Sequence, residues 1–235
     1  MDYIKNSHSS YVGLQLFLFN LSYLSLLILL FSQIIFIEGL KKVIIIFLVI
    51  SCILAFHFKK HNAELNIPNS LTNARLTINI FILSIVFNME GYDEYLFINL
   101  ILISLLLDGA DGFLSRYLMQ DTTFGGLFDQ EVDNFLILIL AISLVYNYDF
   151  IFLILIIPVY RYIFILLIRL KVISNQSLPP SFFRKLICVM TILSLALCNI
   201  YSTVDSIRIL LYVVFILISY SFAKDTFYLY RRKYD

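Results

Sequence analysis

Charged residues are scarce in this chain of 235 residues. Asp, Glu, Lys and Arg make up 14% of the chain, against about 25% in soluble domains. Hydrophobic residues make up 61%, and the mean hydropathy is +0.91. This composition excludes a soluble domain and indicates an integral membrane protein. We expect no nucleic-acid partner.

Cysteine is also rare and shows no pairing pattern. Cys52, Cys188 and Cys198 lie singly in apolar stretches, without CxxC spacing. A disulfide framework or a zinc site would require closer or paired spacing. We therefore interpret all three as packing residues.

The apolar runs lack the period-two alternation of barrel strands, and about 20 residues suffice to cross the hydrocarbon core as a helix. The sequence therefore predicts an all-α membrane protein. The expected spans lie near residues 11–37, 42–58, 73–90, 95–118, 125–147, 149–171, 184–202 and 206–228. The first run is too long for the apolar part of a signal peptide and lacks a small-residue cleavage pattern after it, so we expect it to remain as a span.

A polar stretch, residues 57–75, divides the chain into two predicted parts. Residues 1–60 form a two-helix membrane appendage, and residues 61–235 form a six-helix domain. Basic residues recur at alternate connections, which the positive-inside rule places in the cytoplasm. They are Lys59, Lys60, Arg75, Arg116, Arg169, Lys171, Arg184, Lys185, Arg231, Arg232 and Lys233. Lys41 and Lys42 conflict with this topology, so the first two spans are the least well defined.

Four carboxylates stand out between the apolar runs: Asp108, Asp111, Asp129 and Asp133. One Asp near the centre of a membrane helix costs roughly 2.5 to 3.5 kcal/mol, so four without partners would cost on the order of 10 kcal/mol. Bound cations normally neutralise such a group. The four residues therefore indicate a site with chemistry.

The spacing of the first two carboxylates places them on one helical face. Asp108 and Asp111 are three residues apart, and Ser115 follows four residues later on the same face. Gly112 lies beside them. This face is expected near the cytoplasmic end of its span.

The other two carboxylates repeat the pattern on the next helix. Gly125, Asp129 and Asp133 are four residues apart and line one face. The short link 117–124 makes the two helices an antiparallel pair and brings all four carboxylates into one cluster. Hard oxygen ligands suit Mg²⁺ or Mn²⁺, and the glycines leave room for a diphosphate near the backbone. The cluster is typical of a metal-diphosphate site.

The full pattern of this region resembles the signature of the CDP-alcohol phosphotransferases, also called CDP-alcohol phosphatidyltransferases. Its positions are Asp108, Asp111, Gly112, Ser115, Arg116, Gly125, Asp129 and Asp133. Seven of the eight match, and Ser115 stands where the family usually has Ala. Upstream, Pro68, Asn69, Leu71, Thr72 and Arg75 resemble a PNxLTxxR element found before the first core helix in several branches. The resemblance covers roughly Ile67 to the C-terminus.

The resemblance implies a reaction and a set of roles. The family transfers a phosphatidyl or related group from a CDP-alcohol to an acceptor hydroxyl and releases CMP. Divalent metal ions, expected as a two-metal site, bridge the diphosphate. By similarity, Asp108, Asp111 and Asp129 are metal ligands, and Asp133 is the general base and also a ligand. The resemblance assigns the CDP-alcohol pocket to Asn69, Thr72, Gly112, Ser115, Arg116 and Gly125. Asn69 and Thr72 would close over the nucleotide from the juxtamembrane segment.

The acceptor is predicted from basic residues. Arg161 lies in mid-span, where an Arg usually faces a polar cavity or a carboxylate. Arg184 and Lys185 loosely resemble a basic element that faces phosphorylated acceptors in phosphatidylglycerophosphate synthases. All three also have structural interpretations, as a partner for the aspartates or as positive-inside charges. They favour glycerol 3-phosphate, with serine, choline, inositol phosphate or a second lipid as alternatives.

Two other classes of protein place carboxylates within membrane helices. An ion or proton transporter usually has them near the midplane, without glycines in register. An intramembrane prenyltransferase has two Asp-rich motifs on widely separated helices. The resemblance instead implies a homodimeric enzyme of the bacterial inner membrane that meets CDP-diacylglycerol and a small polar alcohol at the cytoplasmic face.

Overall fold

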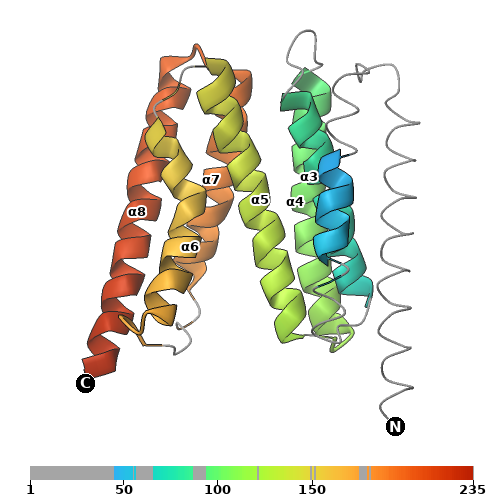
Figure 1. The fold of residues 1–235 in the computed structure, drawn as a ribbon. Helices are drawn as coiled ribbons and strands as arrows, with labels where there is room; N and C mark the ends of the chain where they lie inside the picture. Colours follow the sequence, from blue (N-terminus) through green and yellow to red (C-terminus); the bar gives the residue numbers. More distant parts are fainter. Residues whose placement is uncertain are drawn as a thin grey trace. The chain divides into compact units, whose positions relative to one another are not determined.

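The computed structural model describes residues 45–54, 56, 66–86, 94–120, 122–148, 150, 152–174, 179 and 181–234. Every regular element within these ranges is a helix. In chain order they are the short helix Ile45–Leu54, α3 (Ile67–Val86), α4 (Glu94–Tyr117), α5 (Thr123–Tyr148), the 3₁₀ helix η1 (Phe152–Leu155), α6 (Ile156–Arg169), α7 (Phe182–Ile200) and α8 (Asp205–Tyr234) (Figure 1). The predicted all-α fold is confirmed for this part of the chain.

Four of the described helices are long and apolar enough to cross a membrane. They are Tyr95–Tyr117 in α4, Phe152–Arg169 across η1 and α6, Phe182–Ile200 in α7 and Asp205–Lys233 in α8. The first predicted span lies outside the described residues, and the second is described only as the apolar helix Ile45–Leu54 and residue 56. The count of eight spans therefore stays a prediction.

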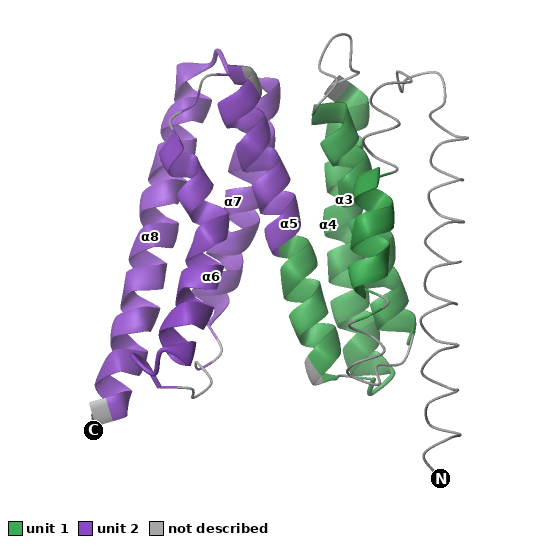
Figure 2. Cartoon of the chain, in the orientation of Figure 1, with its two compact units in different colours: residues 1–133 green, residues 134–235 purple. Residues whose placement is uncertain are grey.

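The chain forms two compact units, residues 1–133 and residues 134–235 (Figure 2). The described part of the first unit contains the helix Ile45–Leu54, α3, α4 and the start of α5. The second contains the rest of α5 together with η1, α6, α7 and α8.

Helix α3 is the most deeply buried element of the first unit. It packs against α4, and 17 of its 20 residues are buried. Polar residues are among them, and several hydroxyl groups bond within the helix; Thr77 Oγ1, for example, donates to the carbonyl oxygen of Asn73 over 3.1 Å. A helix with polar side chains in its buried face is suited to carry a site.

The start of α3 corrects the sequence prediction. The helix begins at Ile67 rather than near residue 73, so Asn69, Thr72 and Arg75 lie within it and not in a juxtamembrane connection. Pro68 explains the early start, because a proline in the first turn has no backbone N–H to leave unpaired and its fixed φ suits a helix. The polar residues that resembled a loop are therefore held on a rigid helix.

Helix α5 begins with a side-chain cap. The backbone N–H of Gly125 donates to Thr122 Oγ1 over 2.9 Å. This bond satisfies one of the N–H groups that a helix start leaves without an intrahelical partner. It also fixes the first turn of α5, from which Asp129 and Asp133 follow at spacings of four.

The second unit is joined by buried amide groups and by aromatic packing. Asn134 Nδ2 donates to the Pro158 carbonyl over 3.1 Å, and Asn199 Nδ2 donates to the Leu140 carbonyl over 3.2 Å, which ties α5 to α6 and to α7. Tyr160 stacks on Phe222 with ring centroids 4.6 Å apart, which joins α6 to α8.

Two further boundaries differ from the prediction. The span expected over residues 149–171 starts as the 3₁₀ helix η1 before α6, because Pro158 cannot donate a backbone hydrogen bond to the turn before it. Helix α8 continues to Tyr234, so Arg231, Arg232 and Lys233 lie in its last turn rather than in a connection. Positive charge is favourable there, at the negative end of the helix dipole.

Candidate active site

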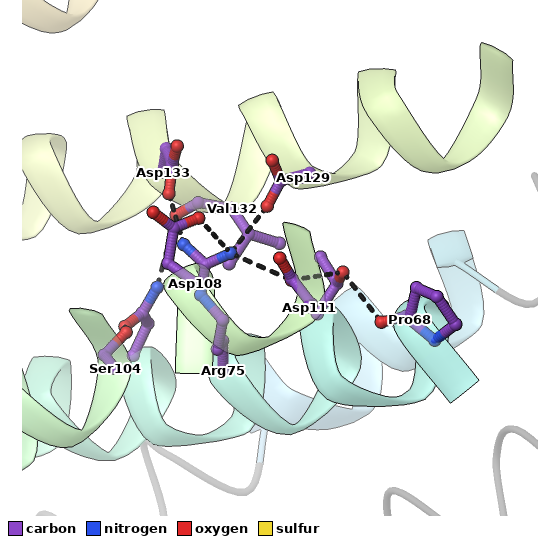
Figure 3. A network of polar contacts seen from close by, with 10 residues as sticks. Pro68, Arg75, Ser104, Asp108, Asp111, Asp129, Val132 and Asp133 are labelled. Atoms are coloured by element: carbon purple, nitrogen blue, oxygen red, sulfur yellow. Dashed lines mark hydrogen bonds and ion pairs between the residues drawn. The ribbon is translucent and has the colours of Figure 1, made fainter. Parts of the chain in front are cut away.

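Four carboxylates meet in the first unit. Asp108 and Asp111 come from the last turns of α4, and Asp129 and Asp133 come from the first half of α5. Figure 3 shows all four turned toward Arg75 of α3. The spacings of three and four residues seen in the sequence thus produce one cluster from two helices.

The guanidinium of Arg75 lies at the centre of the cluster. Its Nη1 is 2.9 Å from Asp108 Oδ1, 3.2 Å from Asp111 Oδ2 and 2.6 Å from Asp129 Oδ1. Its Nη2 donates to Asp133 Oδ1. The Arg75 side chain is 1% exposed, so its guanidinium is shielded from water, although three of its four partners are partly exposed. One cation therefore joins three helices.

Asp111 is the most buried of the four carboxylates, and Thr72 holds it. The side chain of Asp111 is 5% exposed, whereas those of Asp108, Asp129 and Asp133 are 37%, 34% and 26% exposed. Thr72 Oγ1 is 3.0 Å from Asp111 Oδ2 and 3.1 Å from the Pro68 carbonyl oxygen. Its single hydrogen is donated to one of these acceptors at a time. Thr72 therefore connects the first turns of α3 to the carboxylate.

A buried amide holds the same helices together beside the cluster. Asn79 Nδ2 donates to the carbonyl oxygen of Val132 over 3.2 Å, and Ser104 Oγ donates to Asn79 Oδ1 over 2.9 Å. Asn79 of α3 thus bonds to both α4 and α5. Satisfied buried polar groups of this kind fix the relative positions of helices, here next to Asp133 and Asp108.

Three of the carboxylates lie close enough together to hold one metal ion. Asp108, Asp111 and Asp129 each offer an oxygen, and these oxygens lie within 4.8 Å of one another. Oxygens bound to one Mg²⁺ at about 2.1 Å lie at most about 4.2 Å apart, so a small inward shift is enough. The donor set consists of hard oxygens, which Mg²⁺ and Mn²⁺ prefer. Asp133 is outside this set of three, although the sequence had grouped it with them.

A cavity of about 420 Å³ opens beside these carboxylates. It is lined by Pro68, Asn69, Thr72, Asp111, Gly112, Ser115, Arg116, Gln120, Thr122, Gly125, Gly126 and Asp129. All six residues that the sequence assigned to the CDP-alcohol pocket are in this lining. Asp111 and Asp129 belong both to the cavity and to the set of three carboxylates. The volume is typical of a small-ligand site.

Two glycines of the cavity differ in the room around them. A Cβ at Gly125 would lie 2.8 Å from Asn69 Oδ1 and 2.9 Å from Thr122 Oγ1, closer than real side chains approach. A Cβ at Gly112 would meet nothing within 4 Å. A side chain at position 125 would thus have to displace the Asn69 amide and the Thr122 hydroxyl, whereas one at position 112 would enter the cavity.

The predicted acceptor residues all lie in the second unit. Arg161 is half-buried in α6, and Lys185 is exposed on α7. Arg184 Nη1 is 3.3 Å from Asp225 Oδ2 of α8, and its Nη2 donates to the Pro179 carbonyl. Arg184 therefore has a structural partner that the sequence did not indicate.

Sequence reasoning missed several residues of the site. The sequence marks Arg75 only as a basic residue of the predicted topology and as part of the upstream element, and it does not assign Gln120, Thr122 or Gly126 to the site. The sequence contained a signal for Arg75, because the matched element has an Arg six residues after Asn69. Its contact with four carboxylates depends on tertiary packing.

The comparisons with known proteins identify the family of the chain. A model of the CDP-alcohol phosphatidyltransferase family matches residues 65–223, which include every predicted site residue. The match spans more than half of the chain, so the chain belongs to this family of enzymes.

One curated relative carries a more specific name. CDP-diacylglycerol--glycerol-3-phosphate 3-phosphatidyltransferase of Wigglesworthia glossinidia brevipalpis is 36% identical over 80 residues, which cover 32% of this chain and 42% of that protein. The chain thus matches less than half the length of this relative.

Proposed function

We propose that this chain transfers the phosphatidyl group of CDP-diacylglycerol, or of a similar CDP-alcohol, to an acceptor hydroxyl and releases CMP, in phospholipid biosynthesis. In this reaction the acceptor oxygen bonds to the phosphorus of the phosphatidyl group. The bond from that phosphorus to the bridging oxygen of the diphosphate breaks, and CMP leaves with that oxygen.

One observation carries the proposal: carboxylates suited to a divalent cation border a cavity of ligand size. Asp111 and Asp129 belong to both features. The diphosphate of a CDP-alcohol requires a cation to balance its charge, and its nucleotide requires space. Asp111 and Asp129 border both the proposed cation site and the cavity. The family match over residues 65–223 supports the same reaction class.

The proposed roles follow from the positions of the carboxylates. Asp108, Asp111 and Asp129 would hold Mg²⁺ or Mn²⁺, and the family pattern supports two ions, with Asp133 contributing to the second. The bound metal supplies charge neutralisation of the diphosphate. Asp133 accepts the proton of the attacking hydroxyl, a role that suits a carboxylate outside the set of three.

The cavity accounts for binding of the CDP group. Asn69 and Thr72 approach from α3, Gly112, Ser115 and Arg116 from α4, and Gly125 from α5. Arg116 is exposed at the end of α4 and offers a positive charge to the phosphates. The lipid chains of the donor then remain in the bilayer beside the apolar helices.

We propose glycerol 3-phosphate as the acceptor. The printed name of the curated relative supports this choice, as do Arg161 and Lys185, whose positive charges suit an acceptor phosphate. Arg184 would have to leave Asp225 to take part. Serine, choline and inositol phosphate are the alternatives.

The wider setting is proposed on the same basis. Residues 61–235 form the catalytic domain and residues 1–60 a membrane appendage. The protein resides in the bacterial inner membrane, with its active site at the cytoplasmic face, and acts as a homodimer. The four apolar helices support membrane residence.

The experiment is transfer by the purified protein in detergent with CDP-diacylglycerol, Mg²⁺ or Mn²⁺ and a panel of acceptors. CMP release and the lipid product are both followed. We expect CMP release that requires glycerol 3-phosphate and stops in chelator. Dependence on another alcohol would change the acceptor and keep the reaction class, while no CMP release with any acceptor would contradict the proposal.

A further inference from the structure

Arg75 is a cation placed where a metal ion would bind. Its Nη1 lies between 2.6 and 3.2 Å from oxygens of Asp108, Asp111 and Asp129, the same three side chains that can hold a metal. A divalent ion bound to these carboxylates would replace the contacts of Nη1. The arginine and the metal therefore compete for one set of oxygens.

The other terminal nitrogen of the Arg75 guanidinium has a different partner. Nη2 donates to Asp133, which is outside the set of three. A planar guanidinium holds its two terminal nitrogens in a fixed relation. Arg75 thus divides the four carboxylates into three that face Nη1 and one that faces Nη2.

Burial explains why a cation is needed when no metal is bound. Asp111 and Arg75 are 5% and 1% exposed, so water screens neither charge well. Carboxylates gathered from two helices repel one another, and a buried charge without a partner is strongly destabilising. The described structure provides Arg75 as their shared counter-ion, anchored on the buried helix α3.

We propose that Arg75 is an exchangeable internal counter-cation. It holds the four carboxylates together in the metal-free protein. When a divalent cation binds, Nη1 yields Asp108, Asp111 and Asp129 to the ion, while Nη2 keeps its contact with one oxygen of Asp133. This inference rests on the metal dependence of the proposed function. Arg75 is a positioning residue that sets the affinity for metal.

The test measures stability and metal affinity rather than turnover. Thermal unfolding of the full chain in detergent, without donor or acceptor, is followed in chelator and during titration with Mn²⁺. The variants are Arg75→Gln, Arg75→Lys and the double variant Arg75→Gln with Asp133→Asn. Arg184→Gln is the matched control, because Arg184 pairs with Asp225 and donates to the Pro179 carbonyl, and both partners lie outside the cluster.

The proposal predicts a specific pattern. Arg75→Gln unfolds at a lower temperature than wild type in chelator, and saturating Mn²⁺ removes most of the difference, because the ion takes over the role of the guanidinium. Its apparent affinity for Mn²⁺ rises at least about tenfold, since the competing cation is gone. The double variant regains part of the stability in chelator, because one unpaired carboxylate has been neutralised. Arg184→Gln shows the same loss with and without Mn²⁺.

Arg75→Lys keeps the positive charge but replaces the planar guanidinium with a single ammonium group. This variant provides the test if Arg75→Gln does not fold. We expect its stability in chelator to lie below wild type and its affinity for Mn²⁺ to rise. If Mn²⁺ does not change the loss of stability in the Arg75 variants, and their affinity for Mn²⁺ is unchanged or weaker, the counter-cation role is overturned. Release of CMP by the wild-type protein would in that case leave the proposed function intact. A wild-type protein that binds neither Mn²⁺ nor Mg²⁺ would instead overturn the metal-dependent reaction and this inference with it.

Discussion

Thr72 Oγ1 lies 3.0 Å from Asp111 Oδ2, and this contact joins α3 to the most buried carboxylate of the site. Thr72 also lines the cavity, so one side chain borders the proposed nucleotide pocket and orients a proposed metal ligand. The contact gives α3 a direct influence on the carboxylate cluster. It also makes the site sensitive to a change of one hydroxyl group.

The first prediction is that Thr72→Val weakens metal-dependent activity by roughly 10- to 100-fold, the usual effect of losing a partner of a metal ligand. Valine keeps the shape of the side chain and removes the donor to Asp111. The measurement is CMP release as a function of Mn²⁺ concentration. Thr77→Val is the matched control, because Thr77 is buried on the same helix. In the described part of the chain its hydroxyl bonds to the Asn73 carbonyl of that helix and not to a carboxylate of the cluster. Equal effects of both variants would contradict the role of Thr72.

Gly112→Ala should leave the fold intact and weaken binding of the CDP group. Its Cβ would meet no protein atom within 4 Å and would instead enter the cavity. Crowding of a packed ligand by one methyl costs about 1 to 3 kcal/mol, which is roughly tenfold or more in affinity. Binding of CDP-diacylglycerol to the purified protein measures this loss.

Gly109→Ala provides the comparison for Gly112. It lies on the same helix, its Cβ also meets nothing within 4 Å, and it does not line the cavity. We expect donor binding close to wild type. Unchanged affinity in Gly112→Ala as well would show that the donor does not occupy this cavity.

Gly125→Ala should destabilise the protein itself. Its Cβ would collide with Asn69 Oδ1 at 2.8 Å and with Thr122 Oγ1 at 2.9 Å, and relief would displace the capping hydroxyl of α5. Overpacking of this kind costs about 1 to 3 kcal/mol, and each kcal/mol lowers the unfolding midpoint by about 2 to 4 °C for a protein of this size. Thermal unfolding in detergent measures the shift. Gly126→Ala, whose Cβ meets nothing within 4 Å, should unfold near wild type.

Asp133→Asn should reduce turnover by about 10²- to 10⁴-fold, the range that a general base contributes, while donor binding is retained. The amide keeps the size of the side chain and loses the ability to accept the proton of the acceptor hydroxyl. Turnover and binding of CDP-diacylglycerol are measured on the same preparation. Near-normal turnover would show that another group is the base.

Much of this site follows from local spacing. Asp108 and Asp111, and likewise Asp129 and Asp133, are three or four residues apart, so helix geometry alone puts each pair on one face. Most residues of the cavity belong to the two matched patterns, whereas Gln120, Thr122 and Gly126 do not. The all-α fold follows from composition, since apolar segments of this length form helices in a membrane.

The rest depends on tertiary contacts that no local pattern contains. Arg75 resembled a charge at the end of a span, and only the packing of α3 against α4, with the approach of α5, places it among Asp108, Asp111, Asp129 and Asp133. The pairing of Arg184 with Asp225 joins residues 41 positions apart in the chain. The early start of α3 was missed because its first turns are rich in polar residues.

The most direct test of the central claim, a metal-dependent transfer at the carboxylate cluster, compares Asp129→Asn with Glu131→Gln. Both changes neutralise a carboxylate on α5, but Asp129 contacts Arg75 and lines the cavity, whereas Glu131 is exposed and outside both features. CMP release from CDP-diacylglycerol is measured against Mn²⁺ concentration. We predict that Asp129→Asn loses activity by on the order of 100-fold or more and requires more Mn²⁺, while Glu131→Gln behaves as wild type, because only the former removes a proposed metal ligand. Equal activity and equal Mn²⁺ dependence in the two variants would contradict the account.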